Sequence, residues 1–308
     1  MSETSSSATQ HSAPSAQSAQ STSSVPMTIA QNLTPAQQHS VINIVRRAAR
    51  SEILPRYRNL AASDISQKSS AVDLVTIADR NAEAMITRGL SRAFANALII
   101  GEEAVADTPA LLDQLNEAEL AFVIDPIDGT WNFTHGINVF GVIISATRFG
   151  QPIFGLLYDP IMDDYVITGA DEDTRFVMGP NRHKICQTSR KEQAKHLRGV
   201  YHTGLMSAAQ RAIIGEEFPK TGGISNFHCS CHEYRMLAQG HFDFVISVNP
   251  KPWDHLAGAL AARRGGGVAR MIDGTEYSAH TRKGILLVAG NETLWQQLAQ
   301  RYRALAQT

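Results

Sequence analysis

Cysteine is scarce in this sequence, and neither an excess of one charge nor a long apolar run is present. The three cysteines, Cys186, Cys229 and Cys231, are too few and too irregularly spaced for a disulfide framework, so we expect reduced thiols in a cytoplasmic protein. The 28 lysines and arginines nearly balance the 29 aspartates and glutamates, which argues against a nucleic-acid binder. Because no apolar run is long enough to cross a bilayer, we also expect no membrane partner.

The first stretch of the chain lacks apolar anchors. Residues 1–26 are mainly Ser, Ala, Gln and Thr, and such a segment buries too little surface to offset the entropy cost of ordering it. We therefore predict a disordered tail. It has no basic start and no apolar centre, which excludes a signal peptide, and it contains no arginine, which argues against an organellar transit peptide.

Beyond the tail, helical and strand-like patterns alternate. Thr34-Pro35 is typical of a helix start, and the apolar spacing that follows predicts a helix over 35–57. The other predicted helices cover 77–94, 108–115, 206–215, 230–239, 252–264 and 291–306. The predicted strands cover 97–100, 120–124, an antiparallel meander over 139–148, 152–158 and 164–168, and then 200–201, 242–246, 268–271 and 285–288. The pattern indicates an α/β (α+β) fold with subdomains 27–188 and 189–308.

The stretch Asp125-Pro126-Ile127-Asp128-Gly129-Thr130 follows a short apolar run that is typical of a buried strand. Pro126 has no N–H to donate, so we expect the chain to leave the sheet there. Gly129 permits a close backbone approach, and the N–H groups of Gly129 and Thr130 can point at an anion. The stretch thus combines carboxylates for a hard cation with donors for a phosphate.

Acidic residues recur at predicted strand ends and helix starts, where ligand sites form in α/β sheets. They are Asp79, Glu102, Asp125, Asp128 and Asp254. Two carboxylates about 4 Å apart repel by on the order of 4 kcal/mol at an effective dielectric near 20, so convergence requires raised pKa values or bound cations. Oxygen ligands alone favour Mg²⁺ or Mn²⁺ over Zn²⁺. Taken singly, these residues are explained as helix caps or surface turns, and Asp254 after Pro-Trp is more often an N-cap than a ligand.

Taken together, these residues resemble a known family. Gly101-Glu102-Glu103, the 125–130 hexapeptide and Trp253-Asp254-His255-Leu256-Ala257-Gly258 are similar, in that order, to the metal-site motifs of the inositol monophosphatase family. The segment 73–79, with Lys68 before it, also resembles that family, and the likeness covers about residues 35–306. It implies a layered αβαβα sandwich with antiparallel sheet, a homodimer, and a Mg²⁺-dependent, lithium-sensitive phosphomonoesterase.

The same resemblance implies a role for each site residue. The metal ligands for two or three Mg²⁺ ions would be Glu102, Asp125, the carbonyl of Ile127, Asp128 and Asp254. The catalytic residues would be Glu102 and Thr130, which orient a metal-activated water, Asp79, which accepts a hydrogen bond from Thr130, and Lys68, a cationic neighbour. The substrate contacts would come from Asp128, Gly129, Thr130, Ser247 and Asp254.

The resemblance weakens where the alcohol part of the substrate would bind. The glutamate that contacts inositol in the family falls on Ser247, and a serine cannot accept two sugar hydroxyls as a carboxylate does. The family's small-residue helix start is replaced by the residues 229–235. Glu233 or Arg235 would be a substitute polar contact, but we favour a solvated helix face for both, and the two cysteines here are interpreted as buried small hydrophobes.

The reference substrate is therefore a small polyol or sugar phosphate similar to inositol 1-phosphate. Histidinol phosphate, fructose 1,6-bisphosphate and a 3′-phosphorylated adenosine nucleotide remain alternatives within the same chemistry. A non-catalytic phosphosugar-binding regulator is an alternative of a different class, although no ligand is missing. The sequence indicates no shared role for its histidines at positions 135, 202, 228, 232 and 255.

Overall fold

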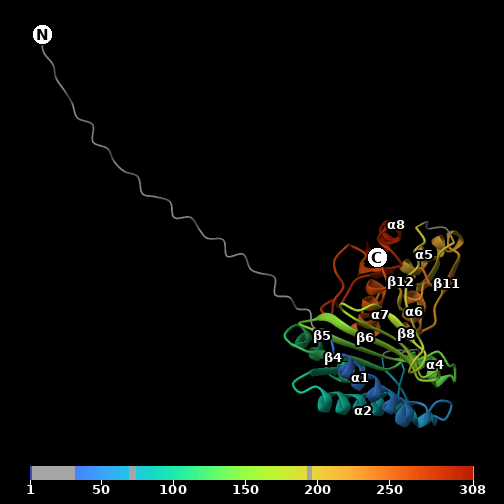
Figure 1. Cartoon of the computed structure of the whole chain (residues 1–308). Coiled ribbons are helices and arrows are strands. Elements are labelled where there is room, and N and C mark those ends of the chain that lie inside the picture. The colour runs from blue at the N-terminus through green and yellow to red at the C-terminus, as the bar shows by residue number, and fades with distance from the viewer. Residues whose placement is uncertain (2–31, 69–73, 193–195, 308) are drawn as a thin grey trace.

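The computed structural model describes Met1 and residues 32–68, 74–192 and 196–307. Apart from Met1, the predicted tail lies outside the described residues, as does Asp73. The described part stacks helices and sheets in five layers, in the order α, β, α, β, α (Figure 1). The predicted layered sandwich is therefore confirmed. Within this part of the chain, no helix has both the length and the apolarity to span a membrane.

The first layer consists of α1 (Pro35–Ala48) and α2 (Ile77–Ala93), which lie along one face of the larger sheet (Figure 1). Thr34 caps α1 and Thr76 caps α2, and in each helix a side chain of the first turn bonds back to the capping residue. The predicted first helix ends earlier than residue 57, because the α-helix passes into a π-helical turn, Ala49–Ile53.

The larger sheet has the strand order β3-β4-β5-β6-β7-β8-β9. Its strands are β3 (Leu98–Gly101), β4 (Ala121–Asp128), β5 (Gly141–Arg148), β6 (Gln151–Asp159), β7 (Asp164–Gly169), β8 (Arg175–Val177) and β9 (His183–Ile185). Only the β3–β4 pair is parallel, so the predicted meander is confirmed. The chain does not leave the sheet at Pro126 as predicted. Instead, β4 continues to Asp128, and its register against β5 shifts between Asp125 and Asp128, around the proline that lacks a donor.

The middle layer consists of α6 (Ser230–Ala238) and α7 (Pro252–Arg264), between the two sheets. Nearly every residue of α7 is buried, as expected for a helix that is covered on all sides. The two helices pack closely because Gly258 has no side chain: a Cβ there would lie 2.0 Å from the Tyr234 ring.

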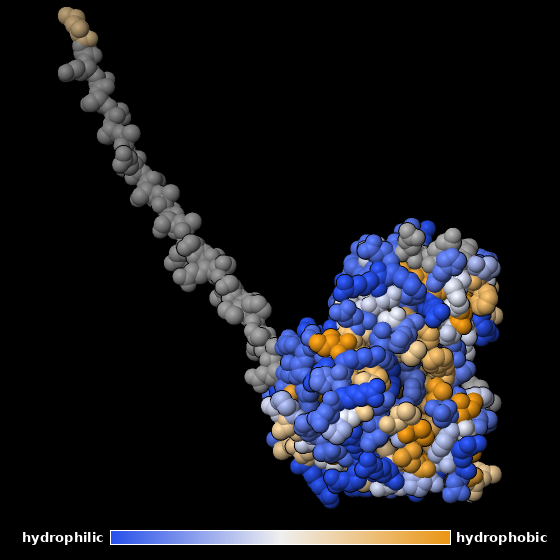
Figure 2. All heavy atoms as spheres, turned by 45° about the vertical axis from the view of Figure 1, so that its right-hand side comes forward, coloured by the Kyte–Doolittle hydropathy of each residue, from blue (hydrophilic) through white to orange (hydrophobic). Residues whose placement is uncertain are grey.

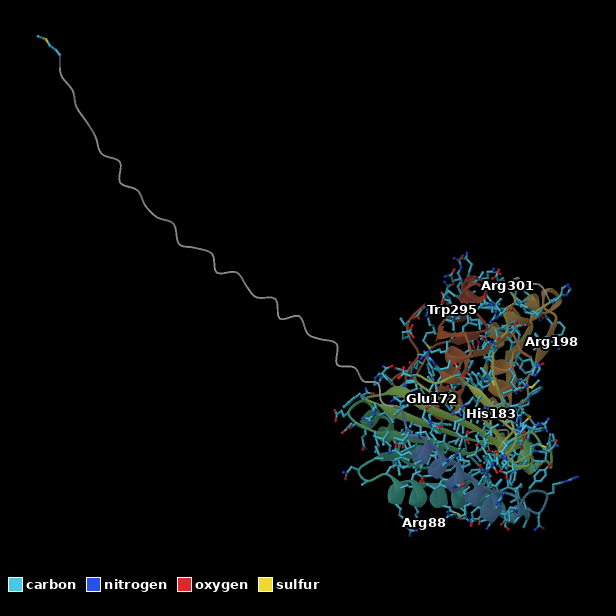
Figure 3. The ribbon with its side chains drawn as sticks, in the orientation of Figure 1. Arg88, Glu172, His183, Arg198, Trp295 and Arg301 are labelled. Atoms are coloured by element: carbon cyan, nitrogen blue, oxygen red, sulfur yellow. The ribbon has the colours of Figure 1, made fainter. Side chains whose placement is uncertain are left out.

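The smaller sheet has the order β11-β10-β12-β14-β13, and β10 is parallel to both of its neighbours. Its strands are β10 (Arg198–Tyr201), β11 (Gly223–Ser225), β12 (Phe244–Ser247), β13 (Val268–Met271) and β14 (Leu286–Ala289). The last layer contains α5 (Ala208–Glu217) and α8 (Glu292–Tyr302). Trp295 on α8 and Arg88 on α2 mark the opposite outer layers in Figure 3.

Two short helices follow the parallel strand pair and begin the site. α3 (Glu102–Asp107) follows β3, and α4 (Thr130–Thr134) follows β4. A small sheet pairs β1 (Ile65–Gln67) with β2 (Leu74–Thr76). Five 3₁₀ segments complete the described elements: Ala62–Asp64, Pro109–Asn116, Thr203–Leu205, Phe218–Lys220 and Arg303–Gln307. The predicted subdomain boundary at residue 188 falls between β9 and β10 and stays a prediction. Hydrophilic residues cover most of the face in Figure 2, with smaller hydrophobic patches among them.

Candidate active site

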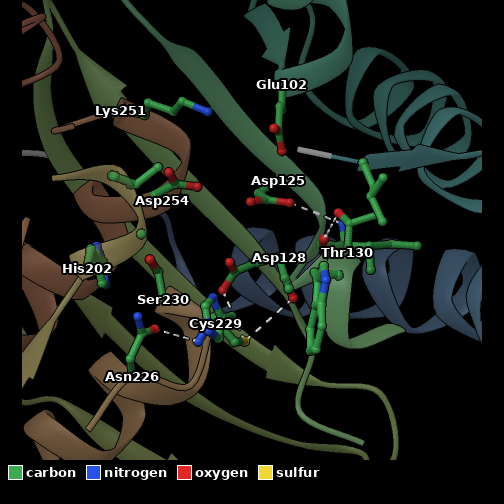
Figure 4. Close-up of a pocket in the computed structure, with 17 residues that line it drawn as sticks. Glu102, Asp125, Asp128, Thr130, His202, Asn226, Cys229, Ser230, Lys251 and Asp254 are labelled. Atoms are coloured by element: carbon green, nitrogen blue, oxygen red, sulfur yellow. Dashed lines mark hydrogen bonds between the residues drawn. The ribbon is translucent and has the colours of Figure 1, made fainter. Parts of the chain in front are cut away.

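Three aspartates from two distant segments meet at the carboxyl end of β4. Asp125 and Asp128 lie on β4 itself, and Asp254 lies in the first turn of α7. One oxygen from each of the three carboxylates lies within 4.8 Å of the others, and Figure 4 shows Asp125, Asp128 and Asp254 around one space. The structure therefore brings together three of the predicted metal ligands.

Glu102 completes this side of the site. It is the first residue of α3, it lines the same cleft, and its carboxylate points toward Asp125 (Figure 4). Glu102, Asp125, Asp128 and Asp254 are called the carboxylate wall below. Lys68 is not among the residues that line the cleft, but its Nζ lies 3.2 Å from Oε1 of Glu102 and 2.6 Å from Oε1 of Glu103.

The position of Glu102 depends on a buried carboxylate of α2. Glu83 accepts hydrogen bonds from the N–H groups of Glu103 (2.9 Å) and Ala104 (3.0 Å), in the first turn of α3. Gly101 leaves room for this contact, because a Cβ there would lie 2.0 Å from the Glu83 carboxyl carbon. Burial raises the pKa of Glu83 to about 7. The contact fixes the start of α3 and hence the direction of Glu102.

Burial and mutual repulsion raise the pKa values of the aspartates in the carboxylate wall. Burial raises the pKa of Asp125 well above its usual range, and Glu102, Asp128 and Asp254 raise it further. The pKa of Asp128 rises to about 8, because burial and the charge of Asp254 outweigh the hydrogen bonds that it accepts. Such a cluster requires protons or cations to be stable. Its ligands are all oxygens, so a hard divalent cation fits it.

Asp128 is held by the start of α6. Its Oδ2 accepts hydrogen bonds from the backbone N–H of Cys231 and, at 3.2 Å, from the thiol of Cys229. Both cysteines are buried, as predicted, and burial raises the pKa of each thiol well above its usual value. Cys229 therefore stays protonated and acts as a donor to a proposed metal ligand.

The hydroxyl of Thr130 lies between two acceptors. It is 3.2 Å from Oδ1 of Asp79 and 3.0 Å from the carbonyl oxygen of Ile127. Asp79 is itself buried, and burial raises its pKa to about 7. Gly129, which precedes the hydroxyl, has φ +89°, and a Cβ there would lie 2.9 Å from the carbonyl oxygen of Val139. The turn thus needs glycine, and the predicted Thr130–Asp79 pair is in contact.

The opposite side of the cleft has a different chemistry. We call His202, Asn226, His228 and Ser230 the histidine wall; His202, Asn226 and Ser230 face the carboxylates in Figure 4. The cleft between the two walls has a volume of about 360 Å³. Trp131 also lines the cleft, and its ring stacks on His135 with a centroid distance of 4.1 Å. The sequence assigned no role to His202, although it follows β10 directly, at the same kind of strand end as the acidic residues.

The predicted solvated face for Glu233 and Arg235 is wrong, because α6 lies in the middle layer. Glu233 is 0% exposed and Arg235 is 6% exposed. Glu233 accepts hydrogen bonds at 2.7 Å from Nε2 of His202 and at 2.7 Å from the backbone N–H of Phe227. Arg235 instead pairs with the carboxylate of Asp164, which lies on β7. Of these two side chains, Glu233 therefore holds a residue that lines the cleft, and Arg235 does not.

Ser247 does not line the cleft. It is fully buried at the end of β12, and its hydroxyl lies 3.3 Å from both the carbonyl oxygen and the N–H nitrogen of Asn249. The structure thus places it apart from the other predicted substrate contacts. His255 is also buried and bonds to the Tyr234 hydroxyl (3.1 Å) and the Asn249 carbonyl oxygen (3.2 Å).

Known proteins resemble this chain over nearly all of its folded length. The model of the inositol monophosphatase family matches residues 36–307. An inositol-1-monophosphatase from Caulobacter vibrioides is 28% identical over 266 residues, which are 86% of this chain and 100% of that protein. A fructose-1,6-bisphosphatase/inositol-1-monophosphatase from Aquifex aeolicus is 26% identical over 275 residues, which are 86% and 96% of the two chains.

A solved structure agrees with these matches. The extragenic suppressor protein SuhB from Bartonella henselae superposes with a TM-score of 0.73 at 26% identity, over 87% of this chain and 98% of that chain. The likeness therefore extends to the arrangement of the layers that carry the site.

Proposed function

This chain belongs to the inositol monophosphatase family and is a phosphatase, and from that premise we propose that it is a Mg²⁺-dependent phosphomonoesterase for a small polyol or sugar phosphate. The observation that carries this proposal is the carboxylate wall, which three separate elements assemble at one cleft. Inositol 1-phosphate is the reference substrate, because it is the substrate named for the Caulobacter relative.

The proposed metal ligands fit Mg²⁺. They are Glu102, Asp125, the Ile127 carbonyl, Asp128 and Asp254, for two or three ions; Mn²⁺ suits the same oxygens. Bound Mg²⁺ would supply Lewis-acid polarisation of the phosphoryl group and activation of water. The family premise also supports sensitivity to Li⁺.

Glu102 and residues next to the carboxylate wall would orient the reactants. The only proton of the Thr130 hydroxyl is directed to Asp79 or to the Ile127 carbonyl, so its oxygen is left to accept a hydrogen bond from the attacking water. Glu102 would accept the second hydrogen bond from that water. The N–H groups of Gly129 and Thr130 would hold the phosphate. Lys68, whose Nζ lies 3.2 Å from Oε1 of Glu102, would add positive charge beside the metal and phosphate site.

A phosphate-release assay tests the proposal. The panel contains inositol 1-phosphate, histidinol phosphate, fructose 1,6-bisphosphate and 3′-phosphoadenosine 5′-phosphate, with Mg²⁺, with Mn²⁺, with Li⁺ added and with chelator. We expect release that requires Mg²⁺ or Mn²⁺ and falls more than about 100-fold in Asp254→Asn, since even residues that only support a metal ligand matter by 10–100-fold. The exposed Asp171→Asn is the matched control.

Two outcomes would contradict the proposal. Equal rates of phosphate release for Asp254→Asn and the wild type would show that the carboxylate wall takes no part in the reaction. Tight binding of a panel member with no turnover at saturating Mg²⁺ would favour a non-catalytic phosphosugar-binding regulator. The proposed homodimer has a separate test, because sedimentation velocity gives the mass of the assembly in solution. The proposed cytoplasmic location stays a prediction.

A further inference from the structure

The histidine wall offers no carboxylate to a sugar hydroxyl. Among the described residues that line the cleft, all four carboxylates belong to the carboxylate wall. Position 247, where the family's glutamate would be expected, is a buried serine whose hydroxyl faces Asn249. A neutral polyol would therefore lack the acceptor pair that it finds in an inositol-binding site.

His202 is instead paired with a carboxylate that the substrate cannot reach. Glu233 is 0% exposed and does not line the cleft, whereas His202 does. A carboxylate that is buried this deeply needs a hydrogen-bonding or cationic partner, and Nε2 of His202 lies 2.7 Å from its Oε2. An anion in the cleft would meet the imidazolium first, with Glu233 on its far side.

The same carboxylate fixes the geometry of the wall. One oxygen of Glu233 holds His202, and the other holds the N–H of Phe227, next to Asn226 and His228. The His202 ring also stacks on His255 with a centroid distance of 5.6 Å. A donor that is fixed in this way loses little entropy on binding a ligand, so its contribution to binding is larger.

The charged groups around His202 agree with this assignment. Burial lowers the pKa of His202, but the carboxylate of Glu233 at 2.7 Å more than offsets this effect, so the net pKa of His202 is raised. On α7, burial holds the pKa of His255 well below its usual value, so this ring stays neutral.

We propose that the His202–Glu233 pair is a leaving-group subsite for a second anionic group, so that the preferred substrate is a phosphomonoester that also carries a carboxylate or a further phosphate. This inference rests on the proposed phosphatase function and narrows its substrate class. His202 would contact the substrate, and Glu233 would be a positioning residue.

A matched pair of probes tests the subsite. 3-Phosphoglycerate and glycerol 3-phosphate differ in one group, a carboxylate in place of a hydroxymethyl. For the wild type with Mg²⁺, we expect kcat/KM to favour 3-phosphoglycerate at least tenfold, which corresponds to roughly 1.4 kcal/mol. In His202→Asn and His202→Gln the ratio should fall to about one.

The variant Glu233→Gln tests whether the negative charge of Glu233 matters apart from its size and shape. The amide keeps the volume but not the negative charge, so we expect the preference to fall at least threefold, through KM for 3-phosphoglycerate rather than through kcat. The controls are His39→Asn and Glu216→Gln, both exposed and outside the cleft, in which the ratio should stay at the wild-type value.

The result also distinguishes this inference from the proposed function. Phosphate release without a preference for the carboxylate probe, or a preference that survives in both His202 variants, would overturn the subsite alone. Absence of release from every substrate would overturn the proposed function. In that case, calorimetric affinities of the two probes for the Mg²⁺-loaded wild type would decide the subsite by the same tenfold criterion.

Discussion

The two walls of the cleft are built on opposite principles. The carboxylate wall collects like charges that repel one another, and its members come from short sequence motifs at the ends of β3 and β4 and at the start of α7. In the histidine wall, His202 is paired with the buried carboxylate of Glu233 behind it, and the members of the wall come from separate segments with no motif. For the proposed reaction, the difference suggests a rule: the metal ligands have to be a fixed set of carboxylates, whereas the proposed leaving-group subsite can be built from other side chains.

The largest predicted effect comes from removing one charge from the carboxylate wall. Asp125→Asn should lower phosphate release more than about 100-fold, since Asp125 is a proposed ligand that interacts with four further carboxylates, those of Glu102, Asp128, Asp254 and Asp79. The same change should raise the melting temperature of the metal-free protein, because it removes repulsion. Steady-state kinetics and calorimetry measure the two effects. A metal-free variant that melts below the wild type would show that repulsion does not dominate this wall.

A smaller loss is expected from the residue that supports this wall. Thr130→Ala should lower kcat about 10–100-fold, because it deletes the hydroxyl that bonds to Asp79 and Ile127. Thr130→Ser retains the hydroxyl and should recover most of the rate. If serine and alanine behave alike, the hydroxyl has no part in the reaction.

The packing of Gly101 against Glu83, which positions Glu102 in the cleft, can be tested by its effect on stability. Gly101→Ala should destabilise the fold by about 1–3 kcal/mol, because the new Cβ would displace the carboxylate of Glu83 from the start of α3. Denaturant unfolding measures this cost. Gly204→Ala is the control, since a Cβ there meets nothing within 4 Å, and a similar cost in both variants would exclude the Glu83 contact as the cause.

The smallest predicted effect is the pH dependence of stability without metal. The pKa values of Asp79 and Glu83 are raised to about 7 and that of Asp128 to about 8. The folded state therefore keeps protons that the unfolded state loses above about pH 4, so stability falls as the pH rises from about 4 to 8. We expect the melting temperature to drop by a few degrees between pH 5 and pH 8, and Mg²⁺ to raise it more at pH 8. A metal-free melting temperature that increases over this range would contradict the assignment.

The parts of the molecule that could be predicted from the sequence are those with local signals. The strand that leads to Asp125 is a contiguous apolar run, and α1 begins at a Thr-Pro cap, so both were recognised. α3 was missed, because a six-residue helix is not stable alone and its cap, Glu83, lies about 20 residues earlier in the chain.

The histidine wall could not be predicted, because its pairing is tertiary. His202 and Glu233 are 31 residues apart and join the end of one strand to a helix of the middle layer. A helix that is covered on both sides has no polar face, so the sequence pattern cannot distinguish a buried glutamate from a solvated one. The assignment of Glu233 and Arg235 to solvent failed for this reason.

The helix α6 contributes to both walls within three consecutive residues. Its Cys231 N–H holds Asp128, and its Glu233 holds His202. A substitution that tilts this single helix would alter ion affinity and substrate choice together, so mutations in α6 should be pleiotropic. Changes in specificity that leave metal affinity intact are therefore more accessible at positions outside this helix, such as Asn226 or His228, than within it.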